Sequence, residues 1–200
     1  MGVGYYVNVS QWDKGEYFDT NNGSSSANYG KGPDDLAIIT SYNGFGYKAD
    51  DAGNTIATAS PLSVSGTTVS GSGLISTRTD ADVFQFTTGA GAVSLNINPA
   101  SLGANLDISA ELYDVNGTLV ASSNPTTALN ASFSLNLAAG QYFLKIDGVG
   151  VGDPTISPPT GYTDYASIGQ YSITGSIVAT TGDALSIAAT SASKAEGNSG

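Results

Sequence analysis

Apolar and polar residues alternate with a period of two in several short stretches between residues 83 and 178. Val93, Leu95 and Ile97, for example, fall on one face of an extended chain. The stretches are 83–87, 92–98, 106–113, 118–121, 133–137, 141–147 and 170–178. Gly-rich turns separate them, and Asn116-Gly117 is a hairpin signal because both residues tolerate positive φ. Seven or eight short strands of this kind predict an all-β fold, an antiparallel β-sandwich.

Residues 1–48 show no such alternation and hold half of the aromatic residues of the chain. Asp34–Thr40 follows Pro33, has an acidic first turn and ends near Asn43-Gly44, which predicts one short helix. A segment this short can hardly bury so many aromatic side chains alone. We therefore interpret it as an irregular end of a domain whose main body is missing. The alternative is an N-terminal extension that packs on the sandwich, with residues 49–62 as a linker.

The composition excludes several functions. A formal net charge of -11 argues against nucleic-acid binding, which needs a basic surface, and is typical of a secreted or cell-surface protein. The chain has no histidine and no cysteine, so it has no ordinary zinc site and no Ser-His or Cys-His pair. By itself it is not predicted to be an enzyme. No apolar run approaches the ~18 residues of a membrane span.

Two acidic loops suggest a metal site. Asp80 and Asp82 are two residues apart and project from one side of an extended chain. Asp50, Asp51 and Asn54 lie in the linker before them and can complete an oxygen-ligand shell if the linker folds back. Calcium takes six to eight such oxygen ligands, so we expect a calcium site at a corner of the sandwich.

Simpler roles remain open for all these acids. Acidic residues in loops are usually solvated turn formers, and Asp80 could simply cap the turn before its strand. Four further aspartates are expected to be surface or turn residues: Asp107, Asp114, Asp147 and Asp153. Five tyrosines are candidate surface aromatics for ligand binding: Tyr113, Tyr142, Tyr162, Tyr165 and Tyr171.

Residues 49–180 resemble the bacterial pre-peptidase C-terminal (PPC) domain. The matching segments are Asn54-Thr-Ile-Ala-Thr-Ala59, Asp80-Ala-Asp-Val-Phe-Gln-Phe86, Leu112-Tyr-Asp-Val-Asn-Gly117, Ala139-Gly-Gln-Tyr-Phe-Leu-Lys-Ile146 and Gly169-Gln-Tyr-Ser-Ile173. The resemblance implies a jelly-roll β-sandwich appended to a secreted protease. Some relatives in bacterial collagenases bind calcium and substrate, with calcium ligands from these same two loops. Their linker usually reads Glu-x-Asn-Asp, where this chain has Asp51, Gly53 and Asn54, so one side-chain ligand is lost and a weaker site is expected.

The flanking segments resemble parts of other domains. Residues 1–48 are similar to the end of the catalytic domain of secreted metzincin-type zinc metallopeptidases, with Met1 in the place of the Met-turn methionine. The His motif that would hold Zn²⁺ is not in this sequence. Residues 181–200 resemble a linker and the truncated start of a Calx-β domain.

Together these features predict a non-catalytic accessory domain of a secreted bacterial metallopeptidase. It would stabilise the parent catalytic domain or hold protein substrate, with calcium bound. The alternatives are a carbohydrate-binding or adhesion module, which an aromatic platform would favour, and a structural spacer.

Overall fold

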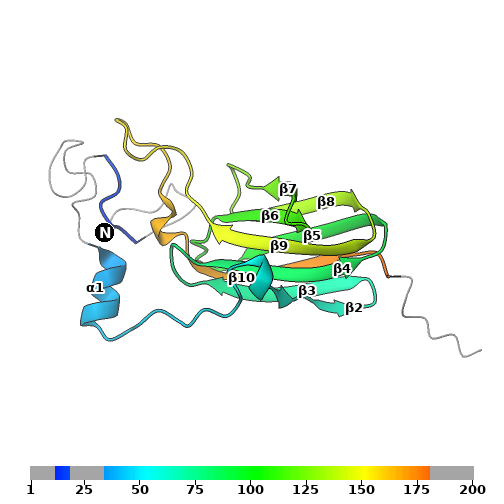
Figure 1. The fold of residues 1–200 in the computed structure, drawn as a ribbon. Coiled ribbons are helices and arrows are strands. Elements are labelled where there is room, and N and C mark those ends of the chain that lie inside the picture. The colour runs from blue at the N-terminus through cyan, green and yellow to red at the C-terminus, as the bar shows by residue number, and fades with distance from the viewer. Residues whose placement is uncertain (1–11, 19–33, 181–200) are drawn as a thin grey trace, which may run out of the picture.

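The computed structural model describes residues 12–18 and 34–180, which form two five-stranded sheets packed face to face (Figure 1). The first sheet has the order β1-β4-β9-β6-β7, with the bounds Ser60–Pro61, Ala81–Thr88, Gly140–Gly148, Ile108–Asp114 and Leu119–Ser123. The second has the order β2-β3-β10-β5-β8, with the bounds Ser63–Ser65, Thr68–Ile75, Gly169–Ser176, Gly91–Pro99 and Ala131–Leu137. The helical elements described are α1, Asp35–Tyr42, and two 3₁₀ turns, η2, Ile56–Thr58, and η3, Asp164–Ala166.

The strand order is that of a jelly roll. Strands β3-β10-β5-β8 of one sheet face β4-β9-β6-β7 of the other, and neighbours within these groups pair antiparallel. The short edge strand β1 departs from the prediction, because it pairs parallel to β4. The predicted all-β sandwich is confirmed, as is the hairpin at Asn116-Gly117, which joins β6 to β7 with Gly117 at φ 75°.

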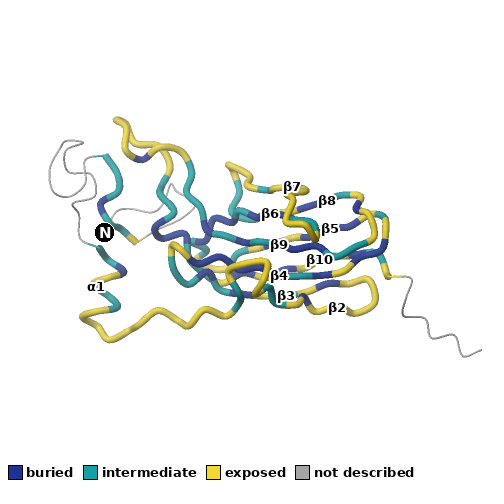
Figure 2. Tube along the Cα trace, viewed as in Figure 1, coloured by how far each residue is buried: buried dark blue, intermediate teal, exposed yellow. Residues whose placement is uncertain are grey.

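The core lies between the sheets, where the apolar positions of the alternating strands meet (Figure 2). Its largest fully buried side chains are Ile75, Leu95, Ile97, Leu106, Ile108, Leu112, Leu144, Ile146, Ile173 and Val69. Most of these positions come from the predicted strands, so the period-two pattern identified the core faces correctly.

The sequence pattern missed the strands before residue 81, and the longest of these, β3, was missed because its inward positions include glycine. Val69 and Ile75 are buried, with Gly71 and Gly73 at the inward positions between them. A Cβ atom added at Gly71 would lie 2.8 Å from Leu62 Cδ2. The linker is also more structured than expected, since it contains η2 and strand β1.

The predicted short helix is confirmed as α1. The side chain of Asp34 accepts a hydrogen bond from the backbone N–H of Ala37, and Asn43 is the C-cap. No helix in the described part of the chain is long and apolar enough to cross a membrane. The Met-turn assignment of Met1 and the Calx-β resemblance of residues 181–200 fall outside the described residues.

Candidate metal centre

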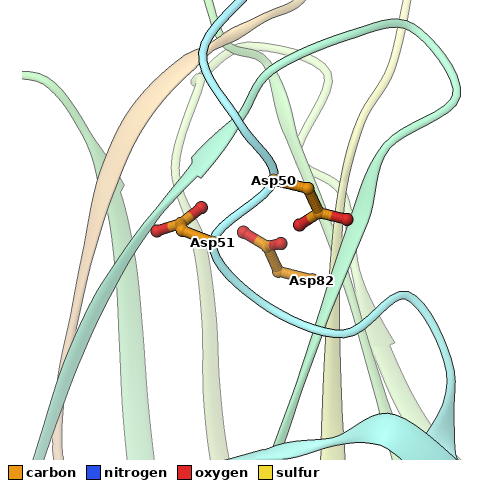
Figure 3. A group of neighbouring side chains, drawn as sticks. All are labelled: Asp50, Asp51 and Asp82. Carbon is orange, nitrogen blue, oxygen red and sulfur yellow. The ribbon is translucent and has the colours of Figure 1, made fainter.

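Three carboxylates converge at one corner of the sandwich. Oxygen atoms of Asp50, Asp51 and Asp82 all lie within 4.8 Å of one another, and Figure 3 shows Asp82 between the other two. Within residues 12–18 and 34–180, no other group of acidic side chains gathers in this way. We call these three residues the acidic group. Asp82 belongs to β4, whereas Asp50 and Asp51 precede η2 in the linker.

The linker reaches β4 because its backbone and side chains bond to the two flanking strands. The N–H of Val83 donates to the carbonyl of Gly53 at 2.9 Å. The N–H of Leu74, in β3, donates to Asp51 Oδ1 at 3.1 Å. The N–H of Ala81 donates to Asn54 Oδ1 at 3.2 Å. These bonds hold residues 51–54 between β3 and β4, which is the folding back that the calcium hypothesis requires.

Asp82 is the buried member of the acidic group, with 0% of its surface exposed. Its Oδ2 accepts a hydrogen bond from the Tyr171 hydroxyl, while its Oδ1 has no partner. Burial raises the pKa of Asp82 to about 7, and the negative charges of its acidic neighbours add to this rise. The hydrogen bond from Tyr171 acts in the opposite direction. A buried oxygen without a partner is costly, and a bound cation would supply one.

Gly73 provides the space in which Asp82 and Tyr171 meet. Tyr171 pairs with Gly73 across β10 and β3. A Cβ atom at Gly73 would lie 2.2 Å from the Tyr171 hydroxyl oxygen and 2.7 Å from Asp82 Oδ2. Glycine is therefore required at this position for the pair to form. The same glycine lines an open cleft together with Lys48, Asp51 and Tyr171, which gives solvent access beside the acidic group.

The two other predicted ligands make different contacts. Asp80 lies outside the acidic group, and its Oδ2 accepts a hydrogen bond from the N–H of Ser76 at 2.6 Å, as expected for a turn cap. Its Oδ1 is also buried without a partner. Asn54 donates a hydrogen bond from Nδ2 to Asp50 Oδ2 at 3.3 Å, so it contacts the acidic group through Asp50.

The position where the resemblance implied a lost ligand is closed to side chains. A Cβ atom at Gly53 would lie 2.1 Å from the carbonyl oxygen of Thr58 and 2.5 Å from its hydroxyl oxygen. The 3₁₀ turn η2 packs too closely on this glycine for an asparagine to fit without a shift of the backbone. The acidic group therefore lacks a ligand from residue 53 for a structural reason.

Several sequence-based assignments are corrected by the structure. Asp107, expected at the surface, is 4% exposed, accepts a hydrogen bond from the Tyr162 hydroxyl at 2.9 Å, and leaves Oδ1 without a partner. Tyr142, Tyr165 and Tyr171 are buried rather than exposed. The burial of Asp107 was missed because this residue directly precedes β6, and outside a strand the period-two pattern does not indicate which side chains are buried.

The sequence matches no protein-family model, and no curated protein matches it. Among the solved structures with a similar chain trace, three have low sequence identity to it. The pre-peptidase C-terminal domain of a Bacillus anthracis collagenase is 12% identical, with a TM-score of 0.42 over 64% of this chain and 99% of that one. PliG of Aeromonas hydrophila, a periplasmic inhibitor of g-type lysozyme, is 14% identical, with a TM-score of 0.37 over 60% and 96%. The Yersinia pseudotuberculosis-derived mitogen is 12% identical, with a TM-score of 0.37 over 58% and 91%. Likenesses this distant do not extend to function.

Proposed function

We propose that the chain is a non-catalytic accessory domain of a secreted protein and binds calcium at the acidic group. The observation that supports this is the convergence of two exposed linker carboxylates on Asp82, whose buried Oδ1 has no hydrogen-bond partner. Like charges brought this close repel one another unless a cation or a proton neutralises them. A divalent cation would relieve the repulsion and satisfy the unpartnered oxygen together.

The chemistry of the donors favours calcium among the divalent cations. All three are carboxylates, two of them on an exposed linker, and the chain has no imidazole or thiolate to offer. Hard oxygen ligands in adaptable geometry suit Ca²⁺, whereas Zn²⁺ sites in proteins usually include nitrogen or sulfur ligands. Bound calcium would join the linker to β4 and so serve as a cross-link in a domain without disulfides.

The accessory role rests on the sequence resemblance to PPC domains and on the absence of histidine and cysteine from the chain. Its partner would be the catalytic domain of a secreted metallopeptidase, with protein substrate as a second binding partner. The carbohydrate-binding alternative gains no support from the sandwich surface. Within the described residues 49–180, the exposed large apolar side chains are all aliphatic. Three of the five tyrosines proposed as surface aromatics are buried.

Thermal unfolding of the full chain with calcium or EDTA tests the proposal. A ligand that binds the folded state alone stabilises it by RT ln(1 + [L]/Kd), about 2.7 kcal/mol at a hundredfold excess over Kd. We expect a calcium-dependent rise in melting temperature in the wild-type protein, and none in Asp82→Asn. The rise should shrink below pH 7, because a proton on Asp82 competes with the metal.

Asp114→Asn is the matched control, because this acid caps an exposed turn through the N–H groups of Asn116 and Thr118. Asp114→Asn should melt at a lower temperature than wild type in EDTA and keep the full calcium response. Identical melting of the wild-type protein in calcium and in EDTA would reject the calcium site. The jelly-roll fold would then serve as a metal-free spacer.

A further inference from the structure

The sandwich holds the N-terminal part of the chain mainly through a group of polar side-chain contacts at the end that carries η3. On the sandwich side this group consists of Arg78, in the loop between β3 and β4, and Asp164 and Tyr165 of η3. On the N-terminal side it consists of Glu16 and the start of α1. Figure 1 shows α1 and the long loop after β9 at the same end of the sandwich.

Arg78 is the only arginine of a chain with 17 acidic and six basic residues, and it joins the two sides directly. Its Nη1 lies 2.9 Å and 3.1 Å from the two carboxylate oxygens of Glu16. Its Nη2 lies 2.5 Å from Asp164 Oδ1. A guanidinium offers several fixed donors and therefore suits a bridge between two carboxylates.

Tyr165 makes the second connection between the sandwich and the N-terminal part. Its hydroxyl donates to Asp34, the N-cap of α1, and accepts the N–H of Leu36 at 3.1 Å. Lys14 Nζ lies 3.9 Å from Asp34 and 5.4 Å from the centre of the Tyr165 ring. Tyr165 and Leu36 are buried at 7% and 8% exposure, so the polar contacts surround a small apolar core.

The N-terminal side is itself tied together, which lets these contacts position it as one piece. The N–H of Asp13 donates to Asp35 Oδ2 at 3.0 Å, and the N–H of Asp35 donates to the carbonyl of Asp13 at 2.9 Å. The N–H of Phe18 donates to the carbonyl of Pro154, in the loop after β9, at 2.7 Å. Residues 12–18 and α1 are thus bonded both to each other and to the sandwich.

We infer that Arg78, Asp164 and Tyr165 form a specific docking surface whose occupant is residues 12–18 together with Asp34–Tyr42 of this chain. The surface sets the orientation of the N-terminal part relative to the sandwich, so residues 43–49, which precede the linker, are not a free tether. The further step, that this docking orients a catalytic domain relative to the sandwich, rests on the proposed accessory function. The docking itself depends on neither that function nor calcium.

Trp12, the only tryptophan of the chain, reports on this contact from the N-terminal side. It is 48% exposed and adjoins Asp13, so its fluorescence anisotropy follows the mobility of the docked segment. We expect Arg78→Gln to lower this anisotropy in EDTA. In the wild-type protein, NaCl at about 1 M should do the same, because the Debye length falls to about 3 Å.

Hydrogen exchange gives a second, local measurement. The N–H of Leu36 is protected by Tyr165, and its exchange requires the contact to open. We expect Arg78→Gln to speed this exchange on the order of threefold to tenfold, the range expected for loss of two partly exposed ion pairs. Amides in the core strands, such as that of Leu144, should keep wild-type rates.

Lys145→Gln is the matched control, because Lys145 also bridges two acids, Glu111 at 3.6 Å and Asp147 at 3.4 Å, on strands β6 and β9. It should leave both Trp12 anisotropy and Leu36 exchange unchanged. The inference would be overturned if Arg78→Gln kept the wild-type Trp12 anisotropy and the wild-type Leu36 exchange rate, and if salt had no effect on the unmutated protein. Because all measurements are made in EDTA, failure of the calcium proposal would leave this result intact.

Discussion

Asp82 and Asp107 have the same local chemistry in two different regions of the molecule. Each is buried, accepts a hydrogen bond from a tyrosine hydroxyl on one carboxylate oxygen, and leaves the other oxygen without a partner. Asp82 lies beside two exposed carboxylates of the linker, whereas Asp107 joins no such group within the described residues. Burial raises the pKa of both, and acidic neighbours raise that of Asp82 further.

This difference separates a tolerated buried acid from a candidate ligand. At Asp107 a single proton removes the charge, and the backbone around it is already bonded, through Ser167 Oγ and the N–H of Val149. At Asp82 one proton leaves the repulsion between Asp50 and Asp51 in place. A divalent cation bound at Asp82 would reduce the repulsion among the three carboxylates and would also give the buried Oδ1 a partner.

The pH dependence of stability should show the largest difference between the two. In EDTA, folding raises the pKa of Asp82 from 3.8 to about 7, so between these pH values the folded state binds more protons than the unfolded chain. The free energy of unfolding therefore decreases as the pH rises from about 4 to 7, by at most about 4 kcal/mol. Asp82→Asn should remove this decrease, whereas Asp107→Asn should remove only the smaller contribution that the raised pKa of Asp107 makes.

Urea unfolding at a series of pH values in EDTA measures these slopes. Saturating calcium should offset the decrease for the wild-type protein and for Asp107→Asn, and it should leave the pH profile of Asp82→Asn unchanged. Parallel pH profiles for all three proteins in EDTA would show that Asp82 is ionised normally.

Two glycines offer a steric version of the same comparison. Gly73→Ala forces a methyl group against the Tyr171 hydroxyl, and Gly148→Ala forces one to within 2.0 Å of the carbonyl oxygen of Ser167, next to Asp107. Each should destabilise the protein by about 1–3 kcal/mol, as overpacking in a core does. Only Gly73→Ala should also weaken the calcium response, because it displaces Asp82.

Gly46→Ala is the control for a Gly→Ala exchange that causes no clash, since nothing lies within 4 Å of a Cβ atom at that position. It should be nearly neutral in chemical unfolding and in calcium response. Equal loss of calcium response in Gly73→Ala and Gly148→Ala would contradict a site confined to the corner at Asp82.

The tyrosine hydroxyls should give the smallest effects. Tyr171→Phe and Tyr162→Phe each remove the single hydrogen bond to a buried carboxylate, at a cost of about 1–2 kcal/mol. Each tyrosine lowers the pKa of its aspartate, so each substitution should raise that pKa further and steepen the pH dependence. Tyr42→Phe, at 83% exposure, should change neither quantity in the same urea titrations. An unchanged pH profile in Tyr171→Phe would argue against the hydrogen bond.

The sequence pattern predicted the strands from β4 onward, and it missed the short edge strands β1 and β2 and the longer strand β3. Alternation is visible only when both faces carry distinct side chains, and the inward Gly71 and Gly73 hide it. The same residues explain why the acidic group was predicted only in part. Both acidic loops were identified, but a local pattern could not show that Gly73 leaves space for Tyr171 to reach Asp82.

The sequence by itself determined the period of the strands, the hairpin at Asn116-Gly117, the capped helix at Asp34 and the two acidic loops. Each of these depends on residues a few positions apart. Tertiary structure decided which acids meet. Asp80 bonds to Ser76, four residues away, while Asp82 bonds to Tyr171, 89 residues away. The pairing of β3 with β10 and the return of the linker to β4 bring such distant groups together, and no local spacing records that pairing.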